Sequence, residues 1–147
     1  MVTEYRKSSH TTFRIELHIV WVTKYRYKVL SGAIGTRARD LLRRISSEER
    51  AEIISGSVSP DHVHLLVSID PSVSVSTLLR QLKGKSSRLL QIEFPELHKR
   101  YWGQHLWARG YFAVSVGNVS KDMVAEYITH HFENKEDASD PFRVEKA

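Results

Sequence analysis

Residues 52–69 read EIISGSVSPDHVHLLVSI, two largely apolar runs separated by residues that favour a tight turn. The Ser-Pro-Asp sequence between the runs is typical of turns, so it predicts an antiparallel hairpin with strands over Glu52–Val58 and His62–Ile69. Successive side chains of a strand point to opposite faces of a sheet. His62 and His64 are therefore expected to share one face of the second strand.

These two histidines form a candidate metal site. Imidazole is the commonest metal ligand in proteins, and a strand holds both rings without the entropy cost of ordering a loop. The same spacing also fits a pair of histidines that simply hydrogen-bond to the backbone or to neighbouring side chains. Two ligands do not complete a metal site, so a third has to come from another part of the chain.

Further segments extend the hairpin into a layered fold. Apolar and polar residues alternate from Thr12 to Thr23, which predicts a strand, whereas residues 32–45 carry the apolar stripe of a helix. A second helix is predicted after Ser74, a good N-cap, and a further strand over residues 111–116. The resulting β-α-β-β-α-β order predicts an α+β fold of the ferredoxin-like or RRM-like type, with helices packed on an antiparallel sheet.

Composition limits the class of protein. The chain has 147 residues, of which 41% are hydrophobic, and this fits one domain over residues 1–147 with a mobile acidic tail from about residue 135. There is no cysteine, which excludes disulfides, thiolate metal sites and cysteine nucleophiles. No run is long enough for a membrane span and the N-terminus is unlike a secretory signal, so we expect a cytoplasmic protein with no membrane partner.

The chain has an excess of positive charge, with 22 Lys and Arg against 17 Asp and Glu. Basic residues concentrate in the first third and around Gly84, which fits a surface that faces nucleic acid or, alternatively, a solvated basic face. The small residues around Gly84 would also let phosphate approach the backbone, although the glycine spacing is not that of a P-loop and solubilising charge on a helix is the simpler explanation. Aromatic residues nearby in sequence fit base stacking or the core. The candidate nucleic-acid contacts are Lys24, Arg26, Lys83, Lys85 and Arg88.

A last helix is predicted from Ser120 to about Asn134. Tyr127 and His131 lie four residues apart in it and share one helical face, with His130 slightly to one side. A tyrosine beside a metal ligand fits a nucleophile that attacks a metal-polarised phosphate and forms a covalent ester. Considered alone, Tyr127 is more simply an amphipathic tyrosine that caps the core, because it is in line with apolar neighbours.

Several short motifs follow one another in a fixed order along the chain. They are Trp21-Val22-Thr23-Lys24-Tyr25-Arg26, Pro60-Asp61-His62-Val63-His64-Leu65-Leu66-Val67, Leu82-Lys83-Gly84, Leu106-Trp107, Gly110-Tyr111-Phe112 and Tyr127-Ile128. Together they resemble the motifs of the single-tyrosine HUH transposases of small insertion sequences. The likeness extends from about residue 13 to residue 132, and several motifs in order are far more specific than any one of them.

The resemblance implies a reaction on single-stranded DNA that carries short hairpins near the ends of the element. His62 and His64 would bind a divalent metal ion, Mg²⁺ or Mn²⁺, and Tyr127 would attack a DNA phosphate to give a 5′-phosphotyrosine and a free 3′-hydroxyl. The 3′ end of another strand can then attack the phosphotyrosine and complete strand transfer. The resemblance also implies a homodimer in which the tyrosine helix of one subunit commonly serves the histidine pair of the other.

The chain departs from the family's pattern at the third metal ligand. The family usually has a glutamine four residues after the tyrosine, whereas this chain has His131 there, beside His130. By position, the resemblance makes His131 the third ligand. A site with three imidazoles leads us to expect that Mn²⁺ activates the protein better than Mg²⁺ does.

The sequence leaves three alternatives open. A domesticated relative would act on chromosomal palindromes rather than on its own element. A non-catalytic nucleic-acid-binding module of RRM-like fold would use the histidines only structurally. A metal-dependent hydrolase without a covalent intermediate would need a general base, for which Asp61 is the one carboxylate beside the histidine pair.

Overall fold

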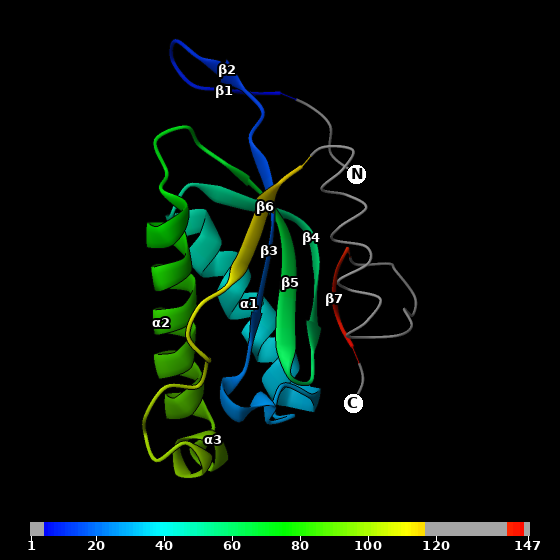
Figure 1. Cartoon of the computed structure of the whole chain (residues 1–147), viewed down its shortest axis with the longest axis vertical. Coiled ribbons are helices and arrows are strands. Elements are labelled where there is room, and N and C mark those ends of the chain that lie inside the picture. The colour runs from blue at the N-terminus through cyan, green and yellow to red at the C-terminus, as the bar shows by residue number, and fades with distance from the viewer. Residues whose placement is uncertain (1–4, 117–140, 146–147) are drawn as a thin grey trace.

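A five-stranded sheet forms the centre of the structure, a computed structural model that describes residues 5–116 and 141–145 (Figure 1). The strands lie in the order β6-β3-β5-β4-β7. Their bounds are β3 Glu16–Val22, β4 Ala51–Ser59, β5 His62–Ile69, β6 Phe112–Ser115 and β7 Phe142–Val144. The strand that carries the two histidines, β5, is therefore the central one, and it pairs antiparallel with both β3 and β4.

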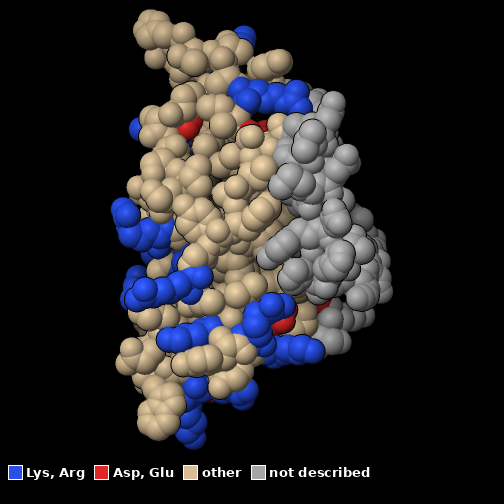
Figure 2. Space-filling model, in the orientation of Figure 1, with Lys and Arg blue, Asp and Glu red and all other residues tan. Residues whose placement is uncertain are grey.

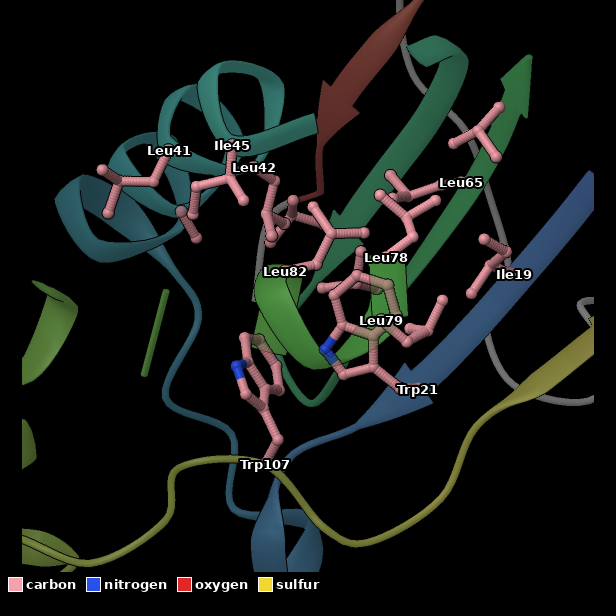
Figure 3. Close-up of a cluster of buried hydrophobic side chains, with 14 of the residues drawn as sticks. Ile19, Trp21, Leu41, Leu42, Ile45, Leu65, Leu78, Leu79, Leu82 and Trp107 are labelled. Atoms are coloured by element: carbon pink, nitrogen blue, oxygen red, sulfur yellow. The ribbon is translucent and has the colours of Figure 1, made fainter. Parts of the chain in front are cut away.

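Two long helices, α1 (Gly32–Glu48) and α2 (Val75–Glu93), bury their apolar stripes against one face of this sheet. Figure 3 shows Leu42 of α1 and Leu82 of α2 in the same cluster as Trp21 of β3, and all three are at most 2% exposed. Burial of this shared apolar surface holds the layers together. The remaining elements are β1 (Arg6–Lys7), β2 (Thr12–Phe13), the 3-10 turn η1 (Lys24–Arg26) and α3 (Pro95–Arg100).

Helix α2 begins where the sequence predicts and continues further than the sequence suggests. Ser74 caps it, because its Oγ accepts a hydrogen bond from the Thr77 backbone N–H at 3.2 Å. The helix then runs through Gly84 without a break. Backbone N–H groups inside a helix are used in its own hydrogen bonds, so phosphate does not reach the backbone around Gly84 and the segment is instead a charged surface of a helix.

The predicted β-α-β-β-α-β order is confirmed in β3, α1, β4, β5, α2 and β6, but the sheet is not purely antiparallel. β7 runs parallel to β4, which makes the sheet mixed. The predicted strand from Thr12 to Thr23 is divided into β2 and β3. α3 was not predicted, because its six residues are too few to show a clear helical period.

The prediction of a mobile tail from about residue 135 is wrong for residues 141–145, the part of this segment that the structure describes. Phe142 is 0% exposed and lies in the core cluster. Two hydrogen bonds hold this end of the chain on β4, from Gly56 N–H to the Pro141 carbonyl at 2.8 Å and from Glu145 N–H to the Val58 carbonyl at 2.7 Å. The acidic composition of the segment masked a short alternation in which an apolar side chain is buried.

The predicted helix from Ser120 to about Asn134 lies outside the described residues, and so do Tyr127, His130 and His131. Across residues 5–116 and 141–145, no helix is both long enough and apolar enough to cross a membrane.

Candidate functional site

His62 and His64 lie on the face of the sheet opposite to α1 and α2. Their neighbours Val63 and Leu65 point into the core and are 0% exposed, so the alternation of the strand places both imidazoles on the other side. The register places His62 beside Val22 and His64 beside Val20 of β3. The shared face that the His-x-His spacing predicts is thus present on the central strand.

Asp61 fixes the orientation of His62. The Asp61 Oδ1 lies 2.8 Å from His62 Nδ1, and Arg26 donates to Asp61 Oδ2 at 3.1 Å. Partial burial opposes ionisation of this carboxyl, but the hydrogen bond from His62 and the charge of Arg26 hold its pKa below the ordinary value. Because an ionised carboxylate only accepts hydrogen bonds, His62 carries a proton on Nδ1, and in the neutral ring Nε2 is the nitrogen with the lone pair.

A strained turn keeps Arg26 in this position. Thr23 N–H donates to the Asp61 carbonyl at 2.9 Å, and Thr23 Oγ1 donates to the Tyr27 carbonyl at 2.7 Å. Tyr25 and Arg26, which lie between Thr23 and Tyr27 in the chain, have positive φ angles of 64° and 54°. The turn therefore ties the end of β3 to the hairpin at Asp61. Arg26, a candidate DNA contact on the sequence, is placed with its guanidinium on Asp61.

His18 is a neighbour of His64 that sequence reasoning missed. Its Nδ1 lies 3.1 Å from His64 Nε2, and the two ring planes are 8° apart. Burial, with further electrostatic contributions from His18 and His62, lowers the pKa of His64 to about 3, so this imidazole is neutral at pH 7. The alternation from Thr12 to Thr23 could have placed His18 on one face, but the register between β3 and β5 is not readable from sequence.

These donors fit a divalent metal ion. Neutral imidazoles are the form that binds metals, and a carboxylate on the second ring nitrogen is the usual partner of a metal-binding histidine. His64 Nε2 faces His18, so a metal would bind His64 through Nδ1 or replace His18 at Nε2. Within residues 5–116 and 141–145, no three or more His, Asp or Glu side chains are grouped to hold a metal by themselves. The predicted ligand His131 lies outside the described residues.

A basic pocket of about 750 Å³ lies between α2, α3 and the segment that follows α3. It is lined by four cationic side chains, and none of the described lining residues is acidic. These four are Lys24, Lys83, Arg88 and Arg109. Figure 2 shows Lys and Arg side chains along the side of the molecule on which α2 lies and at its lower end, with few Asp and Glu between them. Such a surface attracts polyanions.

The two lysines near Gly84 have different surroundings. Lys83 Nζ donates to the carbonyls of Ala108 and Gly110 at 2.9 and 2.8 Å, and burial lowers its pKa. The Lys85 Nζ lies 3.6 Å from a carboxylate oxygen of Glu48 on α1, and Lys85 does not line the pocket. Of the five candidate DNA contacts, the pocket therefore brings together Lys24, Lys83 and Arg88, and it leaves Lys85 and Arg26 apart.

Comparison with known proteins identifies the family. The family model described as Transposase IS200 like matches residues 11–131, most of the chain. The chain belongs to the IS200-like transposase family. It is 34% identical over 125 residues to the ISDra2 transposase TnpA of Deinococcus radiodurans, a match that covers 85% of this chain and 89% of that protein. It is also 34% identical over 126 residues to the IS200 transposase of Salmonella typhimurium, covering 85% and 82%.

Solved structures extend the comparison to the fold. The crystal structure of a provisionally assigned transposase from Deinococcus radiodurans r1 superposes with a TM-score of 0.74 at 31% identity, covering 85% of this chain and 96% of that one. A REP-associated tyrosine transposase bound to a REP hairpin superposes with a TM-score of 0.58 at 13% identity, covering 88% and 75%. This second likeness shows a shared fold only. The resemblance that the sequence motifs predict is confirmed, and the IS200-like chain is a transposase.

Proposed function

We propose that this transposase cleaves and rejoins single-stranded DNA at the ends of its insertion sequence through a 5′-phosphotyrosine intermediate on Tyr127. The observation that supports this most directly is the histidine pair on β5, whose first member is oriented by Asp61 at 2.8 Å. Two imidazoles on one face of a central strand, one of them backed by a carboxylate, have the donor chemistry and the supporting carboxylate that a metal centre requires.

The number of phosphate ester bonds stays constant during the reaction, because each new ester bond replaces one that breaks. The Tyr127 Oη forms a bond to phosphorus while the bond from phosphorus to the 3′ oxygen breaks. The phenol proton passes to solvent, and the departing 3′ oxygen takes up a proton. The reverse attack by another 3′-hydroxyl restores the phosphodiester and frees the tyrosine. A divalent metal held by His62, His64 and His131 would polarise the scissile phosphate.

Asp61 orients a ligand in this scheme and does not serve as a base. Its two carboxylate oxygens are engaged by His62 and Arg26, and its pKa lies below the ordinary value. A group with a low pKa is a weak proton acceptor, so a hydrolase that uses Asp61 as general base is the less favoured chemistry.

The DNA substrate we propose is single-stranded and carries hairpins. The pocket that contains Lys24, Lys83 and Arg88 supports contact with DNA phosphates, since these cations line one pocket and none of its described lining residues is acidic. The related fold seen with a REP hairpin is compatible with hairpin recognition. Action on the protein's own element is favoured over chromosomal palindromes, because the relatives at 34% identity are insertion-sequence transposases. We also propose a homodimer with shared active sites.

The test uses purified protein, Mn²⁺ and single-stranded DNA copied from the flanks of the gene and labelled at its 3′ end, because the 5′-phosphotyrosine retains the fragment that carries the 3′ end. We expect label to remain on the wild-type protein in a denaturing gel and to be absent from Tyr127→Phe. Mn²⁺ is expected to give more adduct than Mg²⁺, because imidazole ligands suit transition metals better than they suit Mg²⁺.

Each other outcome contradicts a defined part of the proposal. A higher yield with Mg²⁺ would contradict the expected metal preference. Labelled Tyr127→Phe protein would exclude Tyr127 as nucleophile. Tight DNA binding that ignores chelator, with no adduct from any flank, would favour the non-catalytic binding module.

A further inference from the structure

Two aromatic side chains project into solvent beside the basic pocket. Trp102 is 84% exposed and Tyr25 is 69% exposed. Each is the sequence neighbour of a residue that lines the pocket, Gly103 in one case and Lys24 in the other. Exposed tryptophan is unusual in a chain whose other two tryptophans, together with Tyr101, are at most 4% exposed.

The backbone holds both aromatic residues in a conformation that bulky residues seldom adopt. Trp102 has a φ of 56° and Tyr25 a φ of 64°. Positive φ is sterically disfavoured for residues of this size, and such outliers gather at functional sites. The free energy gained by burying an aromatic side chain cannot offset this strain, because both side chains are exposed. The strain therefore coincides with the exposure of two aromatic faces next in sequence to residues that line the pocket.

Cations lie near the proposed stacking surfaces. Lys24 Nζ lies 5.5 Å from the centre of the Tyr25 ring. Arg88 and Arg109 line the adjacent pocket. Aromatic rings beside a positively charged groove are the combination that binds single-stranded nucleic acids, because bases stack on the rings while phosphates contact the cations.

We propose that Trp102 and the basic pocket form a subsite for unpaired nucleotides, with a base stacked on Trp102 and the neighbouring phosphates on Arg88 and Arg109. Tyr25 provides a second stacking surface on the Lys24 side. This deepens the proposed function and rests on it, since it names how the DNA strand is held away from the histidine pair. The ligand is unpaired DNA because the bases of a duplex are stacked on one another and do not offer their faces.

The experiment measures DNA binding by fluorescence anisotropy, using the full chain with a labelled 12-nucleotide single strand and with the same sequence as a duplex. Trp102→Ala is expected to weaken single-strand binding by about tenfold or more and to leave duplex binding unchanged. Trp102→Phe keeps an aromatic face and is expected to retain most of the affinity. The matched control is Tyr5→Ala, which removes an aromatic side chain that is 65% exposed and does not line the pocket.

Equal single-strand affinities of the wild type and Trp102→Ala would overturn the subsite. So would a change of oligomeric state in Trp102→Ala without a change in DNA affinity, because the side chain would then cover a protein interface. The adduct assay separates this inference from the proposed function. Adduct on the wild type together with unaltered binding by Trp102→Ala would overturn the subsite alone. Loss of binding in Trp102→Ala with no adduct on the wild type would overturn phosphotyrosine chemistry alone.

Discussion

At the scale of single residues, the main finding is a chain of contacts that ends at His62. Arg26 donates to Asp61 at 3.1 Å, and Asp61 lies 2.8 Å from His62 Nδ1. A carboxylate in this position fixes the ring's tautomer and makes the other nitrogen a better ligand. The basic residue that the sequence suggested for DNA contact thus lies behind the candidate metal ligand.

Asp61→Asn is expected to weaken Mn²⁺ binding by about 10-fold to 100-fold, because an amide neither carries the charge nor selects the tautomer as a carboxylate does. Titration calorimetry of the metal-free protein measures this without relying on DNA cleavage. Asp70→Asn is the control, since Asp70 follows the other end of β5 and its carboxylate contacts Ser72. Equal Mn²⁺ affinities for wild type and Asp61→Asn would contradict the role given to Asp61.

The sequence was sufficient to predict that His62 and His64 share one face of a strand, but not to predict which residues contact them. Alternation within one strand is a local property, so the shared face of the pair follows from spacing. His18 reaches His64 only through the register between two strands that are 46 residues apart in sequence. The contact of Arg26 with Asp61 spans 35 residues and needs a turn with two positive φ angles. Contacts of this kind depend on the folded chain and leave no periodic signal.

At the scale of elements, the hairpin of β4 and β5 is the part that local sequence determines best. Its predicted strands agree with the structure to within a residue at each end, because the Ser-Pro-Asp turn separates two clear apolar runs. Close packing reinforces the pairing at Gly56. A Cβ there would lie 2.5 Å from the His64 carbonyl oxygen, so only glycine lets β4 approach the histidine strand this closely.

β7 shows where composition misled the prediction. Phe142→Ala is expected to reduce the free energy of unfolding by about 3 kcal/mol or more, because a fully buried aromatic side chain leaves a cavity. Urea denaturation followed by circular dichroism measures the change. Ile92→Ala on α2, where the side chain is 66% exposed, is expected to change stability by less than about 0.5 kcal/mol. A similarly small effect of Phe142→Ala would mean that the C-terminal segment is not packed in the core.

At the scale of the whole molecule, the basic pocket and the candidate metal ligands lie in different parts of the fold. The candidate metal ligands lie on the face of the sheet away from the helices, whereas the basic pocket lies among α2, α3 and the segment after α3. The net charge of +5 in the sequence was compatible with a polyanion partner or a solvated basic face, and it did not locate either. Location required the fold, since Lys24 and Arg109 are far apart in sequence and line one pocket.

Salt dependence of DNA binding tests this arrangement. Each phosphate contact with a single strand contributes about 0.7 to the slope of log K against log salt concentration. Arg88→Gln is therefore expected to lower the slope by roughly 0.7, whereas Lys85→Gln, outside the pocket, is expected to leave it unchanged. Anisotropy titrations at several salt concentrations measure both. An unchanged slope for Arg88→Gln would show that Arg88 does not contact a DNA phosphate.

The end of β6 limits where the proposed nucleophile, Tyr127, can act. β6 and β7 are the two edge strands of one sheet, so the chain that carries Tyr127 is tethered at both ends, at points roughly 19 Å apart across the strands. Tyr127 is eleven residues after Val116 in the sequence. A fully extended chain of that length places the Tyr127 Cα at most roughly 40 Å from the Val116 Cα. Any histidine pair that it serves, in its own subunit or in a partner, has to lie within that radius extended by the tyrosine side chain and the scissile phosphate.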